Sequence, residues 1–309
     1  MYIPESEVKA HLCYETLIPA IRQALMDYSA GRVQQPPRTI LRTGDEEGRA
    51  NGWFAAMPVI AGDAMAVKTV TFYPGNAELG IPTHMAIVEL LRRGTGEPLA
   101  VMDGRLITEM RTAAVCAVAF AELAPRHFRK APRSFGILGS GVQAHAHIEA
   151  LRHVWPELAE IRIASRTRAN AERLAAETGA RAATAEDAAG ADVVLTATNS
   201  ATPVLMGRWM RKDAMVLAVG ACGESLRELD DEAMQSSFVV AESRDCVERE
   251  SGDVRLSGAK VSAEIGEVLL GTSGVPIPEE GRIVFKTVGM AIEDLTAARL
   301  VWESMAASR

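Results

Sequence analysis

The chain has 309 residues, of which 48% are hydrophobic and 24% charged, the balance of a folded globular protein with one or two domains. Its formal net charge of −7 argues against sequence-independent binding to nucleic acid or to an anionic membrane, because both need clusters of lysine and arginine. A small anionic ligand held by a few local cations remains compatible with this charge.

The four cysteines stand far apart, and none has the spacing of a zinc site, so we expect free thiols in a reducing cytoplasm and no bound metal. The first residues lack the basic and apolar regions of a signal peptide. No uninterrupted apolar stretch reaches the length of about 18 residues that a transmembrane helix needs. These features predict a cytoplasmic protein without a membrane segment.

The first third of the chain has the pattern of a helix followed by short strands. Apolar residues recur at helical spacing from Val8 to Leu25, and Pro36 with Pro37 excludes a helix interior. Short apolar stretches separated by Gly, Pro and Asp predict a largely antiparallel sheet, with strands at residues 39–41, 52–57, 64–72 and 99–102. Asp103-Gly104 predicts a two-residue hairpin turn into a further strand at 105–108.

After residue 112, strand-like and helical segments alternate, which is typical of βαβ units and a parallel sheet. Strands are expected at 135–138, 161–164, 192–196, 215–219 and 238–240, and helices from residue 142 and over 169–178. We therefore predict an α/β protein with a Rossmann-type doubly wound parallel sheet over 113–289. A second α+β domain with a largely antiparallel sheet comprises 1–112 and is completed by a C-terminal helix, 290–309.

Residues 139–144, Gly-Ser-Gly-Val-Gln-Ala, form the glycine pattern of a dinucleotide-binding loop between a predicted strand and helix. Gly139 permits the tight turn, Gly141 lets a pyrophosphate approach the backbone, and Ala144 lets the helix pack closely on the strand. The free N–H groups at the start of the helix bind the anion. This loop predicts a nicotinamide dinucleotide site.

The second strand of the predicted Rossmann unit ends in Ser165-Arg166-Thr167-Arg168, where an NAD enzyme usually has Asp or Glu for the ribose 2′-hydroxyl. Guanidinium and hydroxyl groups at this point can instead bind a 2′-phosphate. The sequence therefore favours NADPH (NADP+) over NADH. The alternative is that these arginines are ordinary solvated charges of a loop, and this alternative fits Arg168 better than Arg166.

Three cations in the first domain are candidates for binding an anionic substrate. Lys68 stands inside the apolar run 64–72, and a buried lysine needs a counter-charge, which a carboxylate ligand would supply. The alternative is a lysine that reaches solvent from an edge strand. Arg38 follows the two prolines, and Arg111 lies where the domains meet in the sequence. His84 is a candidate proton source, although a lone histidine is more often structural.

Several stretches of the chain, some of which contain these residues, carry a family resemblance: 35–39, 68–73, 100–104, 111–114, 139–144, Gly220 with 227–230, 251–254 and 289–294. Through them the chain resembles the ornithine cyclodeaminase/mu-crystallin family over essentially its full length. The resemblance implies a dimerising N-terminal domain, a Rossmann domain and an active site between them, in a homodimer. It also implies that Arg38, Lys68 and Arg111 hold an amino-acid carboxylate, with Asp294 near the site.

The expected catalytic residues are Lys68, Arg111 and His84. The resemblance also implies residues near the cofactor, and these are Thr112, Ser140, Val142, Gln143, Thr198, Val219 and Met290. The glycine loop and the end of the second Rossmann strand add Gly139, Gly141, Ser165, Arg166 and Thr167 to the expected cofactor site.

Cys222 is a departure from the family pattern. Cyclodeaminases and related alanine dehydrogenases have an aspartate at the matching position, two residues after Gly220. A thiol does not replace an ionised carboxylate at neutral pH unless its pKa is strongly lowered. Cyclodeamination is therefore disfavoured, and the chain resembles most the mu-crystallin-like ketimine reductase branch of the family.

The predicted function is NADPH-dependent reduction of a cyclic imino acid of the 1-pyrroline-2-carboxylate or 1-piperideine-2-carboxylate type, by hydride transfer to the C=N carbon. One alternative is an amino-acid dehydrogenase or a reductase of open-chain imines. Another is an NADPH-binding protein that has lost turnover, although the intact cations argue against it. The expected partners are a small-molecule carboxylate and a second copy of the chain.

Overall fold

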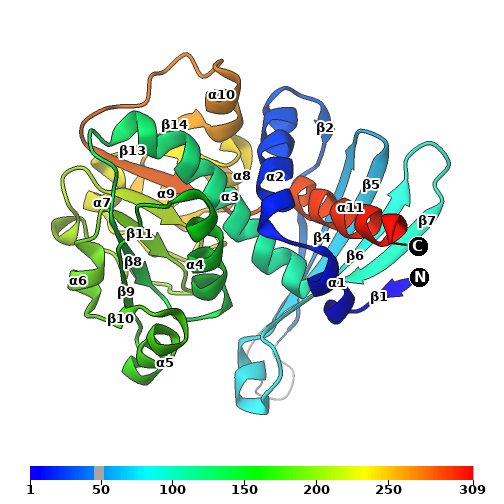
Figure 1. Cartoon of the computed structure of the whole chain (residues 1–309), viewed down its shortest axis with the longest axis horizontal. Coiled ribbons are helices and arrows are strands. Elements are labelled where there is room, and N and C mark those ends of the chain that lie inside the picture. Colours follow the sequence, from blue (N-terminus) through cyan, green and yellow to red (C-terminus); the bar gives the residue numbers. More distant parts are fainter. Residues whose placement is uncertain (45–51, 309) are drawn as a thin grey trace. The chain divides into compact units, whose positions relative to one another are not determined.

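The computed structural model describes residues 1–44 and 52–308. By its contacts the chain splits into two compact units, each with its own sheet (Figure 1). The first unit comprises Met1–Arg111 and Met290–Arg309, and the second comprises Thr112–Gly289. The long helix α3 (Arg105–His127) begins in the first unit and continues into the second.

Within the described residues, the first unit has a seven-stranded sheet of order β1-β7-β6-β5-β4-β2, with β3 also paired to β4. All of its pairings are antiparallel except that of β1 with β7, so the predicted largely antiparallel sheet is confirmed. The strands are β1 (Tyr2–Ile3), β2 (Val33–Gln34), β3 (Thr39–Arg42), β4 (Trp53–Ala61), β5 (Ala64–Phe72), β6 (His84–Arg92) and β7 (Pro98–Asp103).

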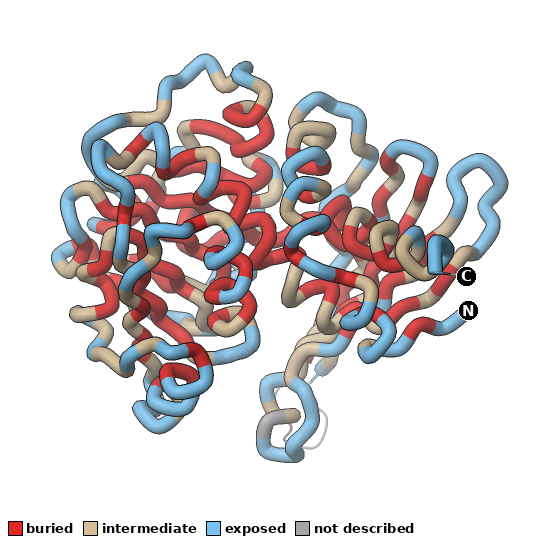
Figure 2. The backbone as a smooth tube through the Cα atoms, in the orientation of Figure 1, coloured by how far each residue is buried: buried red, intermediate tan, exposed pale blue. Residues whose placement is uncertain are grey.

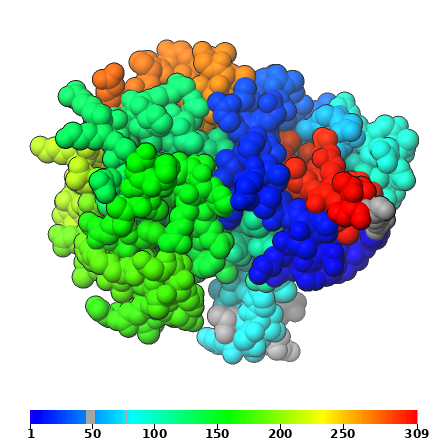
Figure 3. Space-filling model, in the orientation of Figure 1, coloured from blue at the N-terminus to red at the C-terminus, as the bar shows by residue number. Residues whose placement is uncertain are grey.

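One face of this sheet is covered by helices. Along β4, β5 and β6 every second residue is buried, the period expected of a sheet with one covered face. Helix α11 (Ala291–Ala307) packs on these strands and on α2 (Tyr14–Ser29), while α1 (Glu5–His11) also contacts α11. Figure 3 shows the red surface of α11 beside the blue surface of the N-terminal helices.

The predicted hairpin turn at Asp103-Gly104 is wrong. Strand β7 ends at Asp103, and Arg105 begins the 23-residue helix α3 instead of a strand. The Asp103 carboxylate accepts a hydrogen bond from the Arg105 N–H at 2.9 Å and so satisfies one of the N–H groups that the first turn of the helix leaves without a partner within the helix. A Cβ at Gly104 would lie 2.9 Å from the Ala86 Cβ, so the glycine serves close packing. An Asp-Gly pair can thus cap a long apolar helix as well as turn a hairpin.

The second unit has, over the residues that the structure describes, an eight-stranded parallel sheet of order β10-β9-β8-β11-β12-β15-β13-β14. Strands β11 and β12 are buried along their whole length, as expected when both faces of a parallel sheet are covered; the buried core is red in Figure 2. The strands are β8 (Ser134–Leu138), β9 (Glu160–Ala164), β10 (Arg181–Ala182), β11 (Val193–Thr196), β12 (Met215–Ala218), β13 (Ser237–Ala241), β14 (Val261–Glu264) and β15 (Arg282–Lys286).

The alternation of strands and helices confirms the predicted Rossmann-type α/β fold class. Its helices are α4 (Val142–Val154), α5 (Arg168–Thr178), α6 (Ala185–Ala189), α7 (Asp231–Gln235), α8 (Arg244–Glu250), α9 (Gly252–Ser257) and α10 (Ile265–Leu270). Two short 3-10 turns complete the described elements, one in each unit, at Pro74–Leu79 and Gly207–Trp209.

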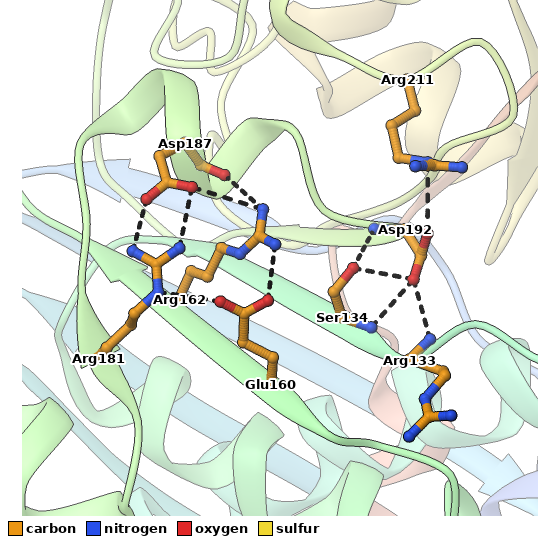
Figure 4. A network of polar contacts seen from close by, with 8 residues as sticks. All are labelled: Arg133, Ser134, Glu160, Arg162, Arg181, Asp187, Asp192 and Arg211. Atoms are coloured by element: carbon orange, nitrogen blue, oxygen red, sulfur yellow. Dashed lines mark hydrogen bonds and ion pairs between the residues drawn. The ribbon is translucent and has the colours of Figure 1, made fainter.

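An ion-pair network joins β9 and β10 to α6 (Figure 4). Arg162 donates to Glu160 at 2.6 Å, and Arg181 donates to both Glu160 and Asp187. These hydrogen bonds favour the ionised carboxylate and lower the Glu160 pKa to about 2. The network is largely exposed, so it orients this edge of the sheet more than it stabilises the fold.

A second network fixes the amino-terminal edge of the same sheet (Figure 4). The Asp192 carboxylate, just before β11, accepts hydrogen bonds from the N–H groups of Arg133 and Ser134 and from the Ser134 hydroxyl. The start of β8 is therefore joined to the start of β11, at the edge opposite to the glycine loop.

Candidate active site

Lys68 lies in the middle of β5, on the helix-covered face of the first sheet, between Met57 and Val88 in the register of the neighbouring strands. Its residue is 2% exposed, and its Nζ lies 2.8 Å from Oδ2 of Asp294 in the first turn of α11. The expectation that a ligand must supply the counter-charge is therefore wrong, since Asp294 supplies it. The alternative of an edge-strand lysine reaching solvent is also excluded by this burial.

Arg111 belongs to the same cluster. Its Nη1 lies 2.6 Å from Oε2 of Glu293, and its Nε lies 3.2 Å from Oδ1 of Asp294. Arg111 is 5% exposed, and both carboxylates are buried, so the pairs are shielded from water. Asp294 thus bridges Lys68 and Arg111, while Glu293 holds the outer part of the guanidinium. We call Lys68, Arg111, Glu293 and Asp294 the cation cluster.

Burial lowers the pKa of Lys68 to about 8, although Asp294 opposes the shift. The charges of Arg111 and Arg38 lower this pKa further, which places Arg38 close enough to act on the same ammonium. Arg38 itself stands directly before β3. Lys68 is therefore mostly protonated at neutral pH, yet it releases its proton more readily than a lysine in water.

His84 begins β6 and pairs with Phe72, so it lies on the same face of the sheet as Lys68. Its pKa is lowered to about 4, mainly by burial and then by the positive charges of Lys68 and Arg111. The ring is consequently neutral at neutral pH. This disfavours His84 as an acid there and leaves Lys68 as the better proton source of the two.

The first unit therefore brings together the four residues predicted to bind or act on the substrate: Arg38, Lys68, His84 and Arg111. Glu293 was missed. The available signal was a pair of acidic residues, Glu293-Asp294, at the start of an otherwise apolar helix. Acidic residues are common in the first turn of a helix because of the helix dipole, so that pattern alone does not indicate an ion pair with Arg111.

The glycine loop lies between β8 and α4, as predicted. Gly139 has a φ of +132°, and a Cβ there would lie 2.5 Å from the carbonyl oxygen of Ala197. A Cβ at Gly141 would meet no heavy atom within 4 Å, and no side chain caps α4 at this residue. The loop therefore offers open space and free N–H groups to a phosphate, which fits a dinucleotide.

The remaining cofactor candidates of the second unit follow the carboxyl ends of parallel strands. The Ser140 hydroxyl donates to the Ser165 hydroxyl at 2.8 Å, which joins the glycine loop to the end of β9. Arg166 and Thr167 follow and are exposed. Arg168 instead pairs with Glu172 one turn along α5, at 2.8 Å. Arg166 thus remains the better candidate for a 2′-phosphate.

The other predicted cofactor residues lie on several elements. Val142 and Gln143 begin α4, Thr198 follows β11, and Val219 follows β12. Thr112 and Met290 stand where the chain passes from one unit to the other. Their roles toward a cofactor stay predictions.

Over residues 1–44 and 52–308, no group of three or more His, Cys, Asp or Glu side chains could hold a metal ion. Among the helices in the described part of the chain, none combines the length and the apolar character that crossing a membrane requires.

Comparisons with known proteins place these features in a family context. The model of the ornithine cyclodeaminase/mu-crystallin family matches residues 1–309. The ketimine reductase mu-crystallin of Mus musculus is 40% identical over 320 residues, covering 100% of this chain and 98% of that protein.

Two solved structures are also similar. A Thermococcus litoralis Δ1-pyrroline-2-carboxylate reductase in complex with NADH and L-proline has a TM-score of 0.91 and 30% identity, covering 100% of this chain and 98% of that one. An archaeal alanine dehydrogenase dimer with bound NAD has a TM-score of 0.91 and 29% identity, covering 100% and 96%.

The lowered pKa of His84 predicts a pH dependence of stability. Between about pH 4 and pH 6.5 the unfolded chain binds a proton at this residue and the folded chain does not, so the free energy of unfolding rises with pH. His84→Gln should make that rise shallower in urea unfolding at pH 4.5, 5.5 and 6.5. Part of the slope will remain, because the pKa of buried His147 is also lowered to about 4.

The matched control is His145→Gln, which removes a partly exposed histidine from α4. A slope unchanged by His84→Gln, or reduced equally by His145→Gln, would contradict the neutral state of His84.

Proposed function

The chain belongs to the ornithine cyclodeaminase/mu-crystallin family, and we propose that it is an NAD(P)H-dependent oxidoreductase that reduces the C=N bond of a cyclic imino acid. The proposed substrates are ketimines of the 1-pyrroline-2-carboxylate or 1-piperideine-2-carboxylate type. The observation that carries the proposal is the cation cluster, in which two buried cations are held by two buried carboxylates. The ketimine and pyrroline-2-carboxylate reductases among the relatives support it.

The chemistry of the cluster suits a carboxylate ligand. A guanidinium and an ammonium in a desolvated place make strong charge-assisted hydrogen bonds to a carboxylate. Arg111 and Lys68 are fixed by Asp294, so little side-chain freedom is lost when the ligand binds. Arg38 adds a third positive charge within range of Lys68. We infer that these three cations orient the carboxylate at C2 of the imine.

Reduction of an imine to an amine needs a hydride at carbon and a proton at nitrogen. A bound nicotinamide dinucleotide supplies the hydride. In the proposed reaction Lys68 holds a proton at Nζ and transfers it to the imine nitrogen when the imine arrives unprotonated. Its pKa of about 8 suits this role, because the ammonium predominates at neutral pH while the transfer is favourable. Asp294 keeps the ammonium charged in spite of its burial.

Cys222 supports reduction over loss of ammonia. It lies in the loop after β12, where its thiol approaches the carbonyl oxygen of Val219 at 3.5 Å. The cyclodeaminase resemblance requires a carboxylate at this position, and the chain has none there.

We also propose that the preferred cofactor is NADPH. The end of β9 carries Ser165, Arg166 and Thr167 and no carboxylate that would repel a 2′-phosphate. The Thermococcus litoralis relative was solved with NADH, so this preference rests on the residues of the present chain.

A homodimer is proposed from the uncovered face of the first sheet. We call this the open face; its large apolar residues are Leu41, Phe54, Met85 and Ile87, at 60%, 36%, 41% and 45% exposure. In the strand register Leu41, Phe54, Thr71 and Met85 form one row across the sheet. Apolar groups gathered on one face mark association sites. The archaeal alanine dehydrogenase relative is a dimer, and we infer that a second copy covers the open face.

Substitutions in the cation cluster test the substrate site. Lys68→Ala and Arg111→Ala should each raise KM and lower kcat for cyclic imines, with kcat/KM falling at least about tenfold, because each removes a charge-assisted contact worth ~1.5–3 kcal/mol. The wild-type rate should also fall above about pH 8, as Lys68 loses its proton. The assay follows NADPH oxidation with cyclic imines, with open-chain keto acids plus ammonia, and with ornithine.

The matched control is Lys9→Ala, an exposed lysine on α1, whose kinetics should equal those of the wild type. Circular dichroism should show that the variants remain folded. Unchanged kinetics in both cluster variants would remove this substrate site, and rapid turnover of ornithine would overturn the reductase assignment.

Arg166→Ala tests the cofactor preference. The Kd for NADPH should rise at least tenfold, because a charge-assisted contact to the 2′-phosphate is lost, while the Kd for NADH should change little. Nucleotide fluorescence measures both. Arg168→Ala is the control, since its guanidinium pairs with Glu172. Equal effects of Arg166→Ala on both dinucleotides would refute the preference.

Light scattering tests the dimer. The wild type should have about twice the chain mass of 33.1 kDa, and a Phe54→Glu, Ile87→Glu double variant should be monomeric because it places charges on the open face. Leu256→Glu, at an exposed apolar position of the second unit, should stay dimeric. A double variant that remains dimeric would show that the copies meet elsewhere.

A further inference from the structure

Among the buried charged side chains of the second unit are Glu228, Asp253 and Lys286, each of them 0% exposed. We call them the buried triad. Lys286 is the last residue of β15, Asp253 lies in α9, and Glu228 lies between β12 and α7. Although they come from distant parts of the sequence, they meet behind the carboxyl edge of the parallel sheet.

The contacts of Lys286 and Asp253 form the base of the triad. Lys286 Nζ lies 3.0 Å from Oδ2 of Asp253 and donates a hydrogen bond to the carbonyl oxygen of Gly220 at 2.6 Å. Oδ1 of Asp253 accepts the N–H groups of Glu228 and Leu229 at 2.7 and 2.9 Å. The pair therefore fixes both the loop after β12 and the backbone that carries Glu228.

Glu228 extends these contacts to the neighbouring strand. Its Oε1 accepts the N–H of Thr198 at 2.5 Å, and its Oε2 accepts the hydroxyl of Thr196, the last residue of β11, at 2.9 Å. The packing is close, because a Cβ at Gly220 would lie 2.1 Å from the Thr198 carbonyl oxygen and 2.5 Å from Oε1 of Glu228. One carboxylate thus holds the loops after β11 and β12 together.

The loop that the triad holds is strained. Ala221 has a φ of +54°, and in the described ranges it is the only residue other than glycine with a positive φ. It is buried, and its N–H donates to the carbonyl oxygen of Thr198 at 3.2 Å. A left-handed alanine persists only where the surroundings enforce it, and such strain is concentrated at functional sites.

Stability alone does not explain this arrangement. Burying charged groups removes their hydration, and apolar residues of similar size are often at least as stabilising in the same place. The triad lies at the carboxyl edge of a parallel sheet, where ligands of doubly wound folds bind. It fixes the backbone next to Thr198 and Val219, both of which are predicted cofactor residues.

We propose that Glu228 is a positioning residue for the dinucleotide: with Asp253 and Lys286 it fixes the loops after β11 and β12 in the conformation that receives the nicotinamide half. This rests on the proposed function in so far as the ligand is a nicotinamide dinucleotide. Glu228 itself is buried behind the loops and does not touch the ligand; it acts through the backbone of Thr198 and Gly220.

The carboxyl group can hold Thr198 in either protonation state. Burial and the charge of Asp253 raise the pKa of Glu228 to about 7, and the ammonium of Lys286 opposes the rise. A protonated carboxyl group keeps one oxygen as acceptor for the Thr198 N–H and donates to the Thr196 hydroxyl. Glutamine offers the same pattern, whereas leucine keeps the bulk and loses the acceptor.

The test compares Glu228→Gln with Glu228→Leu. The Kd for NADPH, measured by nucleotide fluorescence without substrate, should stay within about twofold of the wild type for the glutamine variant and rise at least tenfold for the leucine variant. Thermal unfolding of the ligand-free proteins, measured in parallel, sets a temperature at which all of them are folded.

Asp192→Leu is the matched control, because Asp192 makes three comparable hydrogen bonds at the opposite edge of the same sheet (Figure 4). It should lower the unfolding temperature and leave the Kd for NADPH unchanged. A Glu228→Leu variant that behaves in the same way as this control would overturn the proposal, because Glu228 would then be merely structural. A glutamine variant that binds as poorly as the leucine variant would also overturn it.

Thr196→Val provides a milder variant should Glu228→Leu not fold. It removes the hydroxyl that Glu228 holds and is buried, so it cannot touch the ligand. We expect it to raise the Kd for NADPH about threefold, and no change would contradict the proposal.

Wild-type protein that binds NADPH but reduces no imine would refute the proposed substrate and leave this test intact. If it bound neither dinucleotide, both proposals would fail.

Discussion

The ion pair between Lys68 and Asp294 is the interaction on which the chemistry of the first unit depends. Burial alone would drive a lysine in the middle of a sheet toward its neutral form, which neither attracts a carboxylate nor holds a proton. Asp294 opposes that shift and at the same time contacts Arg111, which also contacts Glu293. The return of the chain to the first unit at α11 is therefore a chemical requirement as well as a packing arrangement, because it delivers both carboxylates.

The second unit uses buried charge in a different way. In the proposed substrate site the positive groups of the cation cluster bind a ligand. In the buried triad Lys286 and its carboxylates instead hold backbone: the carbonyl of Gly220 and the N–H groups of Thr198, Glu228 and Leu229. In both units the buried charges are paired, because an isolated buried charge would destabilise the unit that contains it. In both units the pairing also holds the participating groups in a fixed orientation. The glycine loop differs from both, because it relies on an absent side chain at Gly141 and on free N–H groups.

The sequence was most informative where the chemistry is local. The glycine loop, the alternation of strands and helices, and an unusual lysine in an apolar strand all lie within short windows, and the fold class that they predicted is confirmed.

Long-range features were missed. Strand β15 enters the sheet between β12 and β13, far from its neighbours in sequence, and β6 was not recognised. The family resemblance implied that Asp294 lies near the site, but its pairing with Lys68, 226 positions away in the chain, was not predicted because no local pattern connects the two residues. The prediction of a hairpin turn at Asp103-Gly104 was wrong because the same two residues also suit the start of a helix.

The most direct measurement is a crystal structure of the protein with NADP+ and L-proline, the product that reduction of 1-pyrroline-2-carboxylate would give. It should show the proline carboxylate within hydrogen-bond distance of Lys68 and Arg111, with Arg38 nearby and the contacts of Asp294 retained. A carboxylate bound elsewhere, with these three cations making no contact to it, would contradict the assignment of the cation cluster to the substrate.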